Sequence, residues 1–438
     1  MRTNTRIRRN RSKERGATLL LVTISLFLLF AVAGISIDLV ALYVVRGEAQ
    51  RTADAAALAG ATALVTSGYT SGGTDIVTAE TAARLQATAV ANRNLVSGGG
   101  FTIVAVAFNN MAPALGLPTP NNPQVTVTVD HPAGTYFMRV FGGGHRFENV
   151  ETSATAEVYN PSGVPGGPVF CTGCIKPILL PNSGGQPGGD FVNPTTGQIN
   201  LPAAYPGGII GAELTFLNAG PAGGVWYPIS IDGLLDLYDW ESNVTMCNPV
   251  LLTCGPPNPN VTVLDPATIP PGTATTYLDQ LIHASGPGPN LGQDTILNAA
   301  FTGGPLPFTI TGGPGNHNPN VIGQTILQSD SIATFPIYDD TINPLPLVAG
   351  QQPTIIGFVQ MFIECTTSPV SPGPTCITNP ATPAAEGFTG MVLNVSGCGA
   401  NVGTCGTTGG GGGSGTAPTI SGGGASAVPV RLITPPAP

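Results

Sequence analysis

The chain begins with an apolar run that is long enough to cross a membrane. Residues 16–37 cover 22 positions and include no charged side chain. As an α-helix this run is about 33 Å long, whereas the hydrocarbon core of a bilayer is about 30 Å thick. A helix also satisfies its own backbone polar groups in lipid. The pattern therefore predicts a membrane-spanning helix.

Beyond residue 37 the apolar positions keep helical spacing while charged residues enter between them. The apolar stripe continues through Leu39, Leu42, Val45, Ala49, Ala53, Ala56 and Ala57. Gln50 lies four residues from Arg46 and from Asp54, a spacing that places side chains on one helix face. We expect a single helix over residues 16–67 that ends at a turn near Thr66–Gly68. About half of it would lie in lipid and half would project from it.

The next stretch combines a second helix with strands. Residues 75–94 are rich in Ala and predict a helix that packs back on the first. The following strands are rich in β-branched or alternating residues, with a short aromatic helix expected between the last two. These elements are expected at residues 101–108, 124–130, 136–141 and 148–159.

The remainder, residues 161–438, has a pattern typical of a turn-rich β region. Apolar, strand-like runs recur between segments rich in Gly, Pro, Asn and Thr. The expected strands are 208–217, 225–231, 331–338, 354–365 and 387–395, with a short helix at 232–240. A final strand is expected at 428–434, where Pro429 favours an edge position. The predicted fold class is α+β: a long N-terminal transmembrane, pilin-like helix followed by a mainly antiparallel, disulfide-containing exported region.

Charge divides the chain unevenly and sets the expected orientation. Residues 1–15 hold 7 of the 15 basic residues against one acid, whereas the rest carries 8 basic and 23 acidic residues, a net charge of −15. A basic flank before an apolar span is typical of a segment that stays in the cytoplasm. The acidic remainder argues against a nucleic-acid partner.

A cleaved secretory signal peptide is the competing interpretation of the N-terminus. A basic segment, an apolar stretch and the small residues Ala31-Val32-Ala33 fit such a signal, with a new N-terminus at Gly34. The apolar character continues through Val45, which favours a retained anchor.

Eight cysteines all follow residue 170: Cys171, Cys174, Cys247, Cys254, Cys365, Cys376, Cys398 and Cys405. Eight cysteines allow 105 pairings, but these fall into four couples that are local in sequence. We expect disulfides between them, because the predicted topology places this region in an oxidising compartment. A metal or redox site at the Cys171/Cys174 pair is the alternative, although no second pair at zinc-finger spacing follows it.

No catalytic, cofactor-binding or metal site is predicted. The common nucleophile, phosphate-loop and metallohydrolase motifs are absent from suitable contexts. The four histidines, at positions 131, 145, 283 and 317, are far apart in the sequence and lie in loop-like segments. The acidic cluster Asp232, Asp236, Asp239 and Glu241 lacks the spacing of an EF-hand. A solvated acidic turn is the simpler interpretation.

The first helix carries a family resemblance. Its features are Arg15-Gly16-Ala17, Gly34, Asp38, Tyr43, Arg46, Gln50 and the stretch Ala53–Ala61. With these residues the segment resembles the N-terminal domain of the Tad (tight adherence) family of Flp pilus-assembly, TadE/TadG-like proteins. The resemblance assigns motif roles to Gly16, Asp38, Gln50, Asp54, Leu58 and Gly60. Leu21 stands where pilins and the smaller members usually carry Glu, so cleavage by a prepilin peptidase is not implied.

The resemblance implies a non-enzymatic, membrane-anchored, pseudopilin-like component of a Tad/Flp-type pilus or surface-assembly system. Its partners would be the membrane and other pilus or secretion-assembly subunits. It would cross the bacterial inner membrane once, with the N-terminus cytoplasmic and the bulk periplasmic or at the cell surface. The alternative is a secreted or surface-displayed β-rich adhesin or binding module that has lost a signal peptide.

The expected organisation has four segments. Residues 1–15 form a basic cytoplasmic segment and residues 16–67 the anchor with its projecting helix. Residues 68–160 form a helix-plus-β unit, and residues 161–438 form a Gly/Pro-rich β domain with local disulfides.

Overall fold

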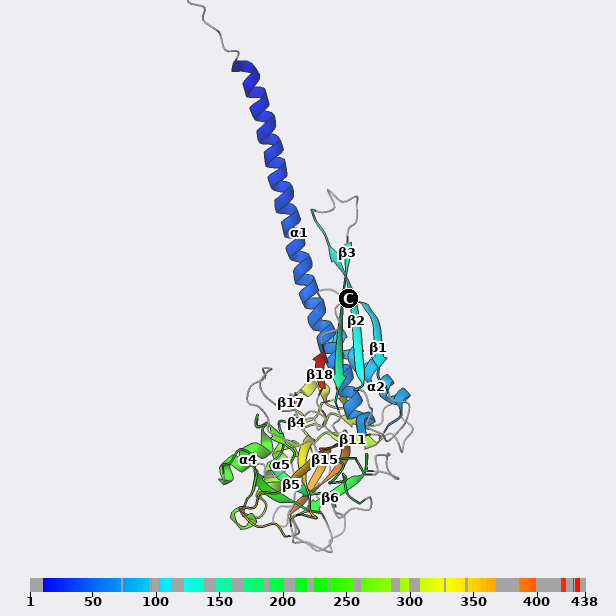
Figure 1. Ribbon diagram of the computed structural model, residues 1–438, viewed down its shortest axis with the longest axis vertical. Coiled ribbons are helices and arrows are strands. Elements are labelled where there is room, and N and C mark those ends of the chain that lie inside the picture. The colour runs from blue at the N-terminus through cyan, green and yellow to red at the C-terminus, as the bar shows by residue number, and fades with distance from the viewer. Residues whose placement is uncertain are drawn as a thin grey trace, which may run out of the picture.

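A computed structural model shows a long helix that rises from a β-rich body (Figure 1). The structure describes residues 11–71, 74–94, 96, 102–111, 122–137, 147–159, 169–183, 189–200, 209–218, 224–234, 236–255, 261–284, 292–298, 308–326, 328–342, 346–367, 386–398, 419–422, 428 and 430–433. The α+β class expected from the sequence is confirmed.

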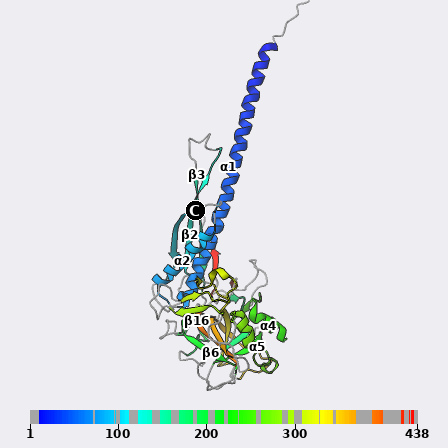
Figure 2. The ribbon, with the colours of Figure 1, turned by 180° about the vertical axis from the view of Figure 1, so that it is seen from behind.

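Helix α1 spans Arg11–Thr66, which is 56 residues without a break. Its N-terminal part stands clear of the rest of the molecule, and its C-terminal part enters the body (Figures 1 and 2). The single long helix expected from the pattern is confirmed. It ends at Thr66 in a turn that is closed by a 2.9 Å hydrogen bond from the Gly68 amide to the Val65 carbonyl. The short helix η1 follows at Tyr69–Ser71.

The first sheet packs against α1 and against α2, which spans Ile76–Arg93. Its strands are β1 at Thr102–Asn109, β2 at Gln124–Gly134, β3 at Phe147–Val158 and β18 at Val430–Ile433, in the order β1-β2-β3-β18. All three pairings are antiparallel. Alternate residues of β2 are buried, including Val125, Val127 and Val129, because successive side chains in a strand point to opposite faces.

The C-terminal strand β18 completes this first sheet. Val430 is opposite Val158 in β3, and Arg431 forms an ion pair with Glu157. The edge position expected for residues 428–434 is confirmed for the part that is described. Because β18 pairs with β3, we propose that the long β-rich segment between them is an insertion into the first unit, in place of a simple boundary at residue 160.

The inserted region is built on an eight-stranded sheet of order β10-β8-β5-β14-β15-β16-β6-β7. These strands are β5 at Ile178–Pro181, β6 at Glu213–Leu217, β7 at Gly224–Val225, β8 at Tyr227–Ser230, β10 at Thr262–Val263, β14 at Ile332–Tyr338, β15 at Ile355–Thr367 and β16 at Gly387–Gly397. Only the β5–β14 and β6–β7 pairs are parallel. The strands expected at 331–338 and 354–365 are confirmed as β14 and β15, which pair antiparallel.

Two small sheets and several short helices surround this large sheet. One has the order β11-β12-β13 and the other β17-β4-β9. Their strands are β11 at Thr295–Asn298, β12 at Phe308–Thr311, β13 at Thr325–Ile326, β17 at Thr419–Gly422, β4 at Val169–Thr172 and β9 at Leu252–Thr253. The helices are α4 at Leu237–Thr245, α5 at Thr273–Leu281, η2 at Pro266–Thr268 and η3 at Pro319–Val321.

Two local expectations differ from the structure. The helix expected at 232–240 begins at Leu237, because Asp236 caps it by accepting a 2.7 Å hydrogen bond from the Asp239 amide. The aromatic segment at 136–141 begins with a bend at Tyr136 and Phe137, and its remaining residues lie outside the described part. The Gly run at 409–413 also lies outside it.

The largest apolar core lies in the inserted region, between the eight-stranded sheet and helices α4 and α5. Trp240 of α4 is buried there, and its indole N–H donates to the Pro177 carbonyl over 2.8 Å. A separate core joins α1, α2 and the first sheet. The Ser71 hydroxyl links the two parts, since it hydrogen-bonds the Asn394 side chain and both backbone groups of Val395.

The disulfides connect segments that are distant in sequence. Cys174 bonds Cys247 across 73 residues, and Cys254 bonds Cys398 across 144. The local couples Cys171/Cys174, Cys247/Cys254 and Cys398/Cys405 are therefore wrong. Strand pairing explains this, because β4 pairs with β9 and thereby brings two distant loops together. Cys171 and Cys365 are also disulfide-bonded, whereas Cys376 and Cys405 lie outside the described residues.

The Cys254–Cys398 bond provides a test of how the inserted region is stabilised. Both cysteines are buried, and the bond joins the segment after β9 to the end of β16. Replacing both by Ser should lower the free energy of unfolding by about 2–5 kcal/mol, because the unfolded chain gains the freedom of a large loop. Thermal unfolding in detergent measures this loss.

The matched control is the double Ser variant of Cys174 and Cys247, whose bond closes a shorter loop and lies nearer the surface. It should lower the unfolding midpoint less. An unchanged midpoint in the Cys254/Cys398 variant would contradict the role given to this bond.

Candidate functional site

The two halves of α1 face different surroundings. From Leu19 to Val44 most large apolar side chains are exposed, and the helix is long and apolar enough to cross a membrane by length and composition. From Ala49 onward one face of α1 is buried by α2 and the first sheet. The candidate functional site is therefore the region between these halves, where α1 is fastened to the body.

Asp38 is the first charged residue after the apolar run, and it is fully buried. Its two carboxylate oxygens accept hydrogen bonds from the backbone amides of Tyr136 (3.0 Å) and Phe137 (2.7 Å). Hydrogen bonds to a charged acceptor are stronger than those between neutral groups. Asp38 therefore attaches the loop after β2 to α1 at the end of the apolar run.

Gly34 lies one turn before Asp38 and contacts the same loop. A Cβ atom placed on Gly34 would come within 2.8 Å of the Phe137 ring, which is closer than carbon atoms pack. The ring therefore occupies space that only glycine leaves open. Tyr136 and Phe137 remain 72% and 43% exposed, so exposed aromatic residues lie beside α1 at the level where its apolar run ends.

Gln50 makes the next attachment. Its amide donates hydrogen bonds to Asp54 Oδ1 (2.8 Å) on the following turn and to the Ser153 carbonyl of β3 (3.2 Å). The expectation that Gln50 and Asp54 share a helix face is confirmed. The pair joins α1 to the middle of the first sheet.

Small residues then allow α1 to pack closely. Ala53, Ala56, Ala57 and Ala61 are fully buried against α2 and the sheet. A Cβ on Gly60 would lie 3.0 Å from Val125 and 3.3 Å from the Ala83 carbonyl. Leu58 is half-buried at the edge of this core and lines an open hollow between α1 and α2.

The structure thus gives the family-motif residues distinct positions. Asp38 and Gln50 bind the body by hydrogen bonds, Asp54 orients Gln50, and Gly60 and Leu58 belong to the packed half. Gly16 lies in the N-terminal turns of α1, among residues whose side chains are not described. The residues that sequence reasoning missed are the partners across the fold, namely Phe137, Ser153 and Val125, because no local pattern relates them to α1.

The acidic cluster is used largely within the fold. Asn243 donates to Asp232 Oδ2 (3.2 Å) and to Asp239 Oδ2 (3.0 Å), whereas Asp236 caps α4. Burial and the nearby Asp232 carboxylate raise the pKa of Asp239. Glu241 accepts a hydrogen bond from the Tyr277 hydroxyl over 2.7 Å.

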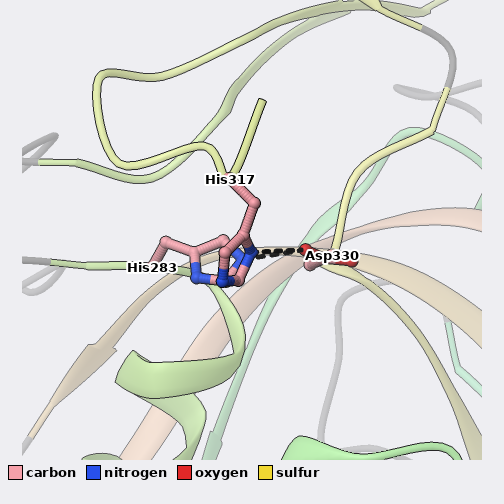
Figure 3. A group of neighbouring side chains, drawn as sticks. All are labelled: His283, His317 and Asp330. Atoms are coloured by element: carbon pink, nitrogen blue, oxygen red, sulfur yellow. Dashed lines mark hydrogen bonds and ion pairs between the residues drawn. The ribbon is translucent and has the colours of Figure 1, made fainter. Parts of the chain in front are cut away.

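Two of the histidines that are far apart in the sequence lie together in the structure. His283 and His317 lie edge to face with their ring centroids 4.2 Å apart, and both rings approach Asp330 (Figure 3). Three separate loops supply these residues, so no spacing in the sequence could have revealed the group.

Asp38 gives a direct test of the attachment. In the Asp38→Ala variant the amides of Tyr136 and Phe137 lose their acceptor, so their hydrogen exchange should become faster. A hydrogen bond to a charged group contributes about 1.5–3 kcal/mol. Hydrogen exchange with mass spectrometry measures both amides in detergent-solubilised protein.

The matched control is Asp75→Ala. Asp75 accepts hydrogen bonds from the amides of Val77 and Thr78 at the start of α2, each over 3.0 Å. This variant should accelerate exchange at Val77 and Thr78 and leave Tyr136 and Phe137 unchanged. Unchanged exchange at the latter two amides in Asp38→Ala would show that the carboxylate does not hold the loop.

Comparison with known protein families gives a match in α1. Residues 16–63 match the Tad family, whose description is Putative Flp pilus-assembly TadE/G-like. No curated protein and no solved structure matches the chain. The matched residues are those of the exposed apolar half of α1 and of its attachment to the body. The N-terminal segment of this chain is therefore a Tad-family N-terminal domain, which fits a pilus-related, membrane-anchored component.

Proposed function

We propose that the protein is a non-enzymatic, pseudopilin-like subunit of a Tad/Flp-type pilus or surface-assembly system. In this proposal the first half of α1 stays in the bacterial inner membrane and residues 1–15 remain in the cytoplasm. The β-rich body lies in the periplasm or at the cell surface. The observation that carries the proposal is the exposed apolar half of α1, joined without a break to a half that is packed into the body.

The exposure of the first half supports membrane insertion. The large side chains from Leu19 to Phe30 are each at least half exposed, and they surround the helix on all sides. Contiguous apolar patches larger than a few hundred Å² are rare on soluble monomers and mark binding or membrane sites. A helix that is apolar all round fits lipid better than a single protein partner.

The attachment site supports an interface position for the start of the body. Asp38 ends the uncharged run, and the exposed aromatic rings of Tyr136, Phe137 and Tyr43 lie near this level of α1. Tyr and Trp are enriched where membrane proteins meet the headgroup region. The body would then begin at the periplasmic surface of the inner membrane, and the unbroken helix α1 would join it to the anchor.

Charge and cysteine chemistry support the orientation. The basic residues before the span favour a cytoplasmic N-terminus. The disulfides of the inserted region require an oxidising environment, which the periplasm or the cell surface provides.

A secreted adhesin or binding module remains the second candidate, and the small residues Ala31-Val32-Ala33 favour it. Cleavage there would leave Gly34 and Asp38 at the new N-terminus, where they would still contact the loop at Phe137. The two candidates therefore differ in whether residues 16–33 persist in the mature protein.

The Leu28→Arg variant tests the anchor. Leu28 lies near the middle of the uncharged run and is exposed. A charge at the centre of a span costs about 2.5–3.5 kcal/mol on insertion scales. We expect the variant to be depleted from the membrane fraction or degraded, as measured by fractionation and immunoblotting.

Tyr238→Arg is the matched control, because it adds the same charge to an 83% exposed position on α4. It should leave the membrane fraction unchanged. Full membrane retention of Leu28→Arg would indicate that the body, and not the helix, provides attachment.

A further inference from the structure

Two histidines and one aspartate converge at the surface of the inserted region. His283 follows α5, His317 lies in the loop before η3, and Asp330 precedes β14. His283 Nε2 is 2.7 Å and His317 Nδ1 is 3.7 Å from the same atom, Asp330 Oδ2. One nitrogen of each imidazole and one carboxylate oxygen lie within 4.8 Å of one another. Figure 3 shows both rings turned toward this carboxylate.

These distances are close to those that a bound metal ion requires. Metal–nitrogen and metal–oxygen bonds to Zn²⁺ are about 2.0–2.2 Å long, so ligand atoms around one ion are about 3–3.5 Å apart. Small rotations of the side chains would bring the three atoms into this range. Asp330 and His317 are 61% and 80% exposed, whereas His283 is 17% exposed. The two exposed side chains are free to adjust, and the site is open to solvent.

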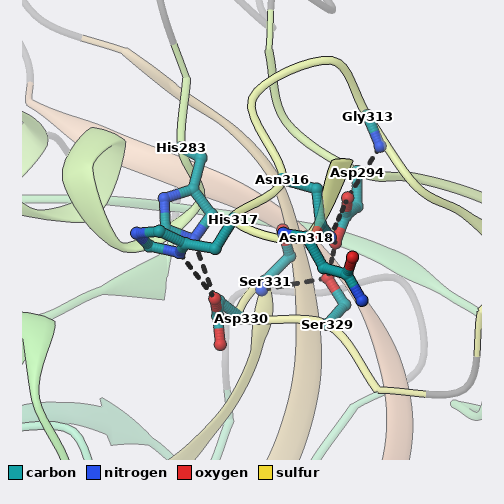
Figure 4. A network of polar contacts seen from close by, with 9 residues as sticks. All are labelled: His283, Asp294, Gly313, Asn316, His317, Asn318, Ser329, Asp330 and Ser331. Atoms are coloured by element: carbon teal, nitrogen blue, oxygen red, sulfur yellow. Dashed lines mark hydrogen bonds and ion pairs between the residues drawn. The ribbon is translucent and has the colours of Figure 1, made fainter. Parts of the chain in front are cut away.

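A buried carboxylate holds two of the three loops in place. Asp294 is buried, and it accepts hydrogen bonds from the Gly313 amide (2.7 Å) and from the Asn316 side chain (3.0 Å). It also accepts one from the Ser329 hydroxyl over 2.6 Å. The first two groups belong to the loop of His317, and Ser329 precedes Asp330. Asp294 therefore fixes these loops relative to each other beside the exposed cluster (Figure 4).

The third loop packs against the loop of His317 through backbone contact. A Cβ on Gly315 would lie 2.6 Å from the His283 carbonyl, so only glycine fits there. The Gly315 amide also donates to the Gly292 carbonyl over 2.7 Å. The backbone of His283 has a positive φ of 57°, which is uncommon for a residue other than glycine. The three side chains are thus presented by loops with fixed backbones.

A simple ion pair accounts for only part of this arrangement. A protonated His283 would be enough to pair with Asp330, but it gives no reason for a second imidazole. His317 is mostly exposed, so burial does not hold it against His283.

Lys176 is a buried cation whose charge interacts with the Asp330 carboxylate. Its ammonium donates a hydrogen bond to the Met246 carbonyl over 3.1 Å. Burial lowers the pKa of Lys176 to about 8, while the Asp330 carboxylate acts in the opposite direction.

We propose that His283, His317 and Asp330 bind a divalent transition-metal ion, with water completing its coordination. Two imidazoles and a carboxylate form a ligand set that suits Zn²⁺, Cu²⁺, Ni²⁺ or Fe²⁺. The bound ion would join the ends of three loops at the periphery of the large core. This proposal differs from the sequence-based prediction that the chain has no metal site, and it is independent of the function proposed for α1.

Zinc titration of the full chain tests the site. Protein is purified in detergent through a tag without histidine, treated with a chelator and titrated with Zn²⁺ by calorimetry. We expect one ion per chain. His317→Gln should weaken binding by more than about 100-fold, because removal of a supporting group alone already costs 10–100-fold. The high exposure of His317 makes this variant suitable, since its side chain contributes little to the core.

His145→Gln is the matched control, because it removes a histidine from elsewhere in the sequence. It should bind Zn²⁺ as the unmodified chain does, and X-ray absorption of the zinc complex should show two imidazoles. The proposal is overturned if the unmodified chain binds no Zn²⁺. It is also overturned if His317→Gln and His145→Gln bind it equally, which would indicate adventitious binding only.

Discussion

The exposed apolar surface of the first half of α1 limits how the whole molecule can be placed. A helix of this length without charges is unstable in water unless lipid or another protein covers it. The same helix continues into the body without a break. The body is therefore held in a fixed position relative to the first half of α1. Asp38, Gly34 and Gln50 then fix the orientation of the first sheet on α1. A rigid connection of this kind suits a subunit whose body must be held in a defined orientation at a membrane.

The second half of α1 packs against α2 and the first sheet, and the three share one apolar core. Alanine and glycine at the contact positions bring the backbones of α1 and α2 close together, and alternate valines of β2 pack in the same core. The chain returns to this sheet at its C-terminal strand β18, after the whole inserted region. Both ends of the inserted region therefore connect to strands of the first sheet, which packs on α1.

Features set by local pattern could be predicted from the sequence. The extent of α1, the capped helix α2 and the hairpin of β14 with β15 all follow from periodicity and turn residues. Features set by contacts between distant residues could not. The pairing of Cys254 with Cys398 depends on how β9 and β16 lie in space, and local spacing suggested other partners. The carboxylate of Asp38 could be singled out, but its acceptor role toward Tyr136 and Phe137 could not. His283, His317 and Asp330 meet only because three loops converge on Asp294 and on glycine backbones.

Residues 16–45 should persist in the mature protein as a membrane anchor that is continuous with the body. The intact mass of the protein extracted from membranes measures this. We expect a mass that retains the uncharged run from Gly16 to Ile37 and continues through Val45. A mature chain that begins at Gly34 would rule out the anchor, because the part of α1 that fits lipid would have been removed.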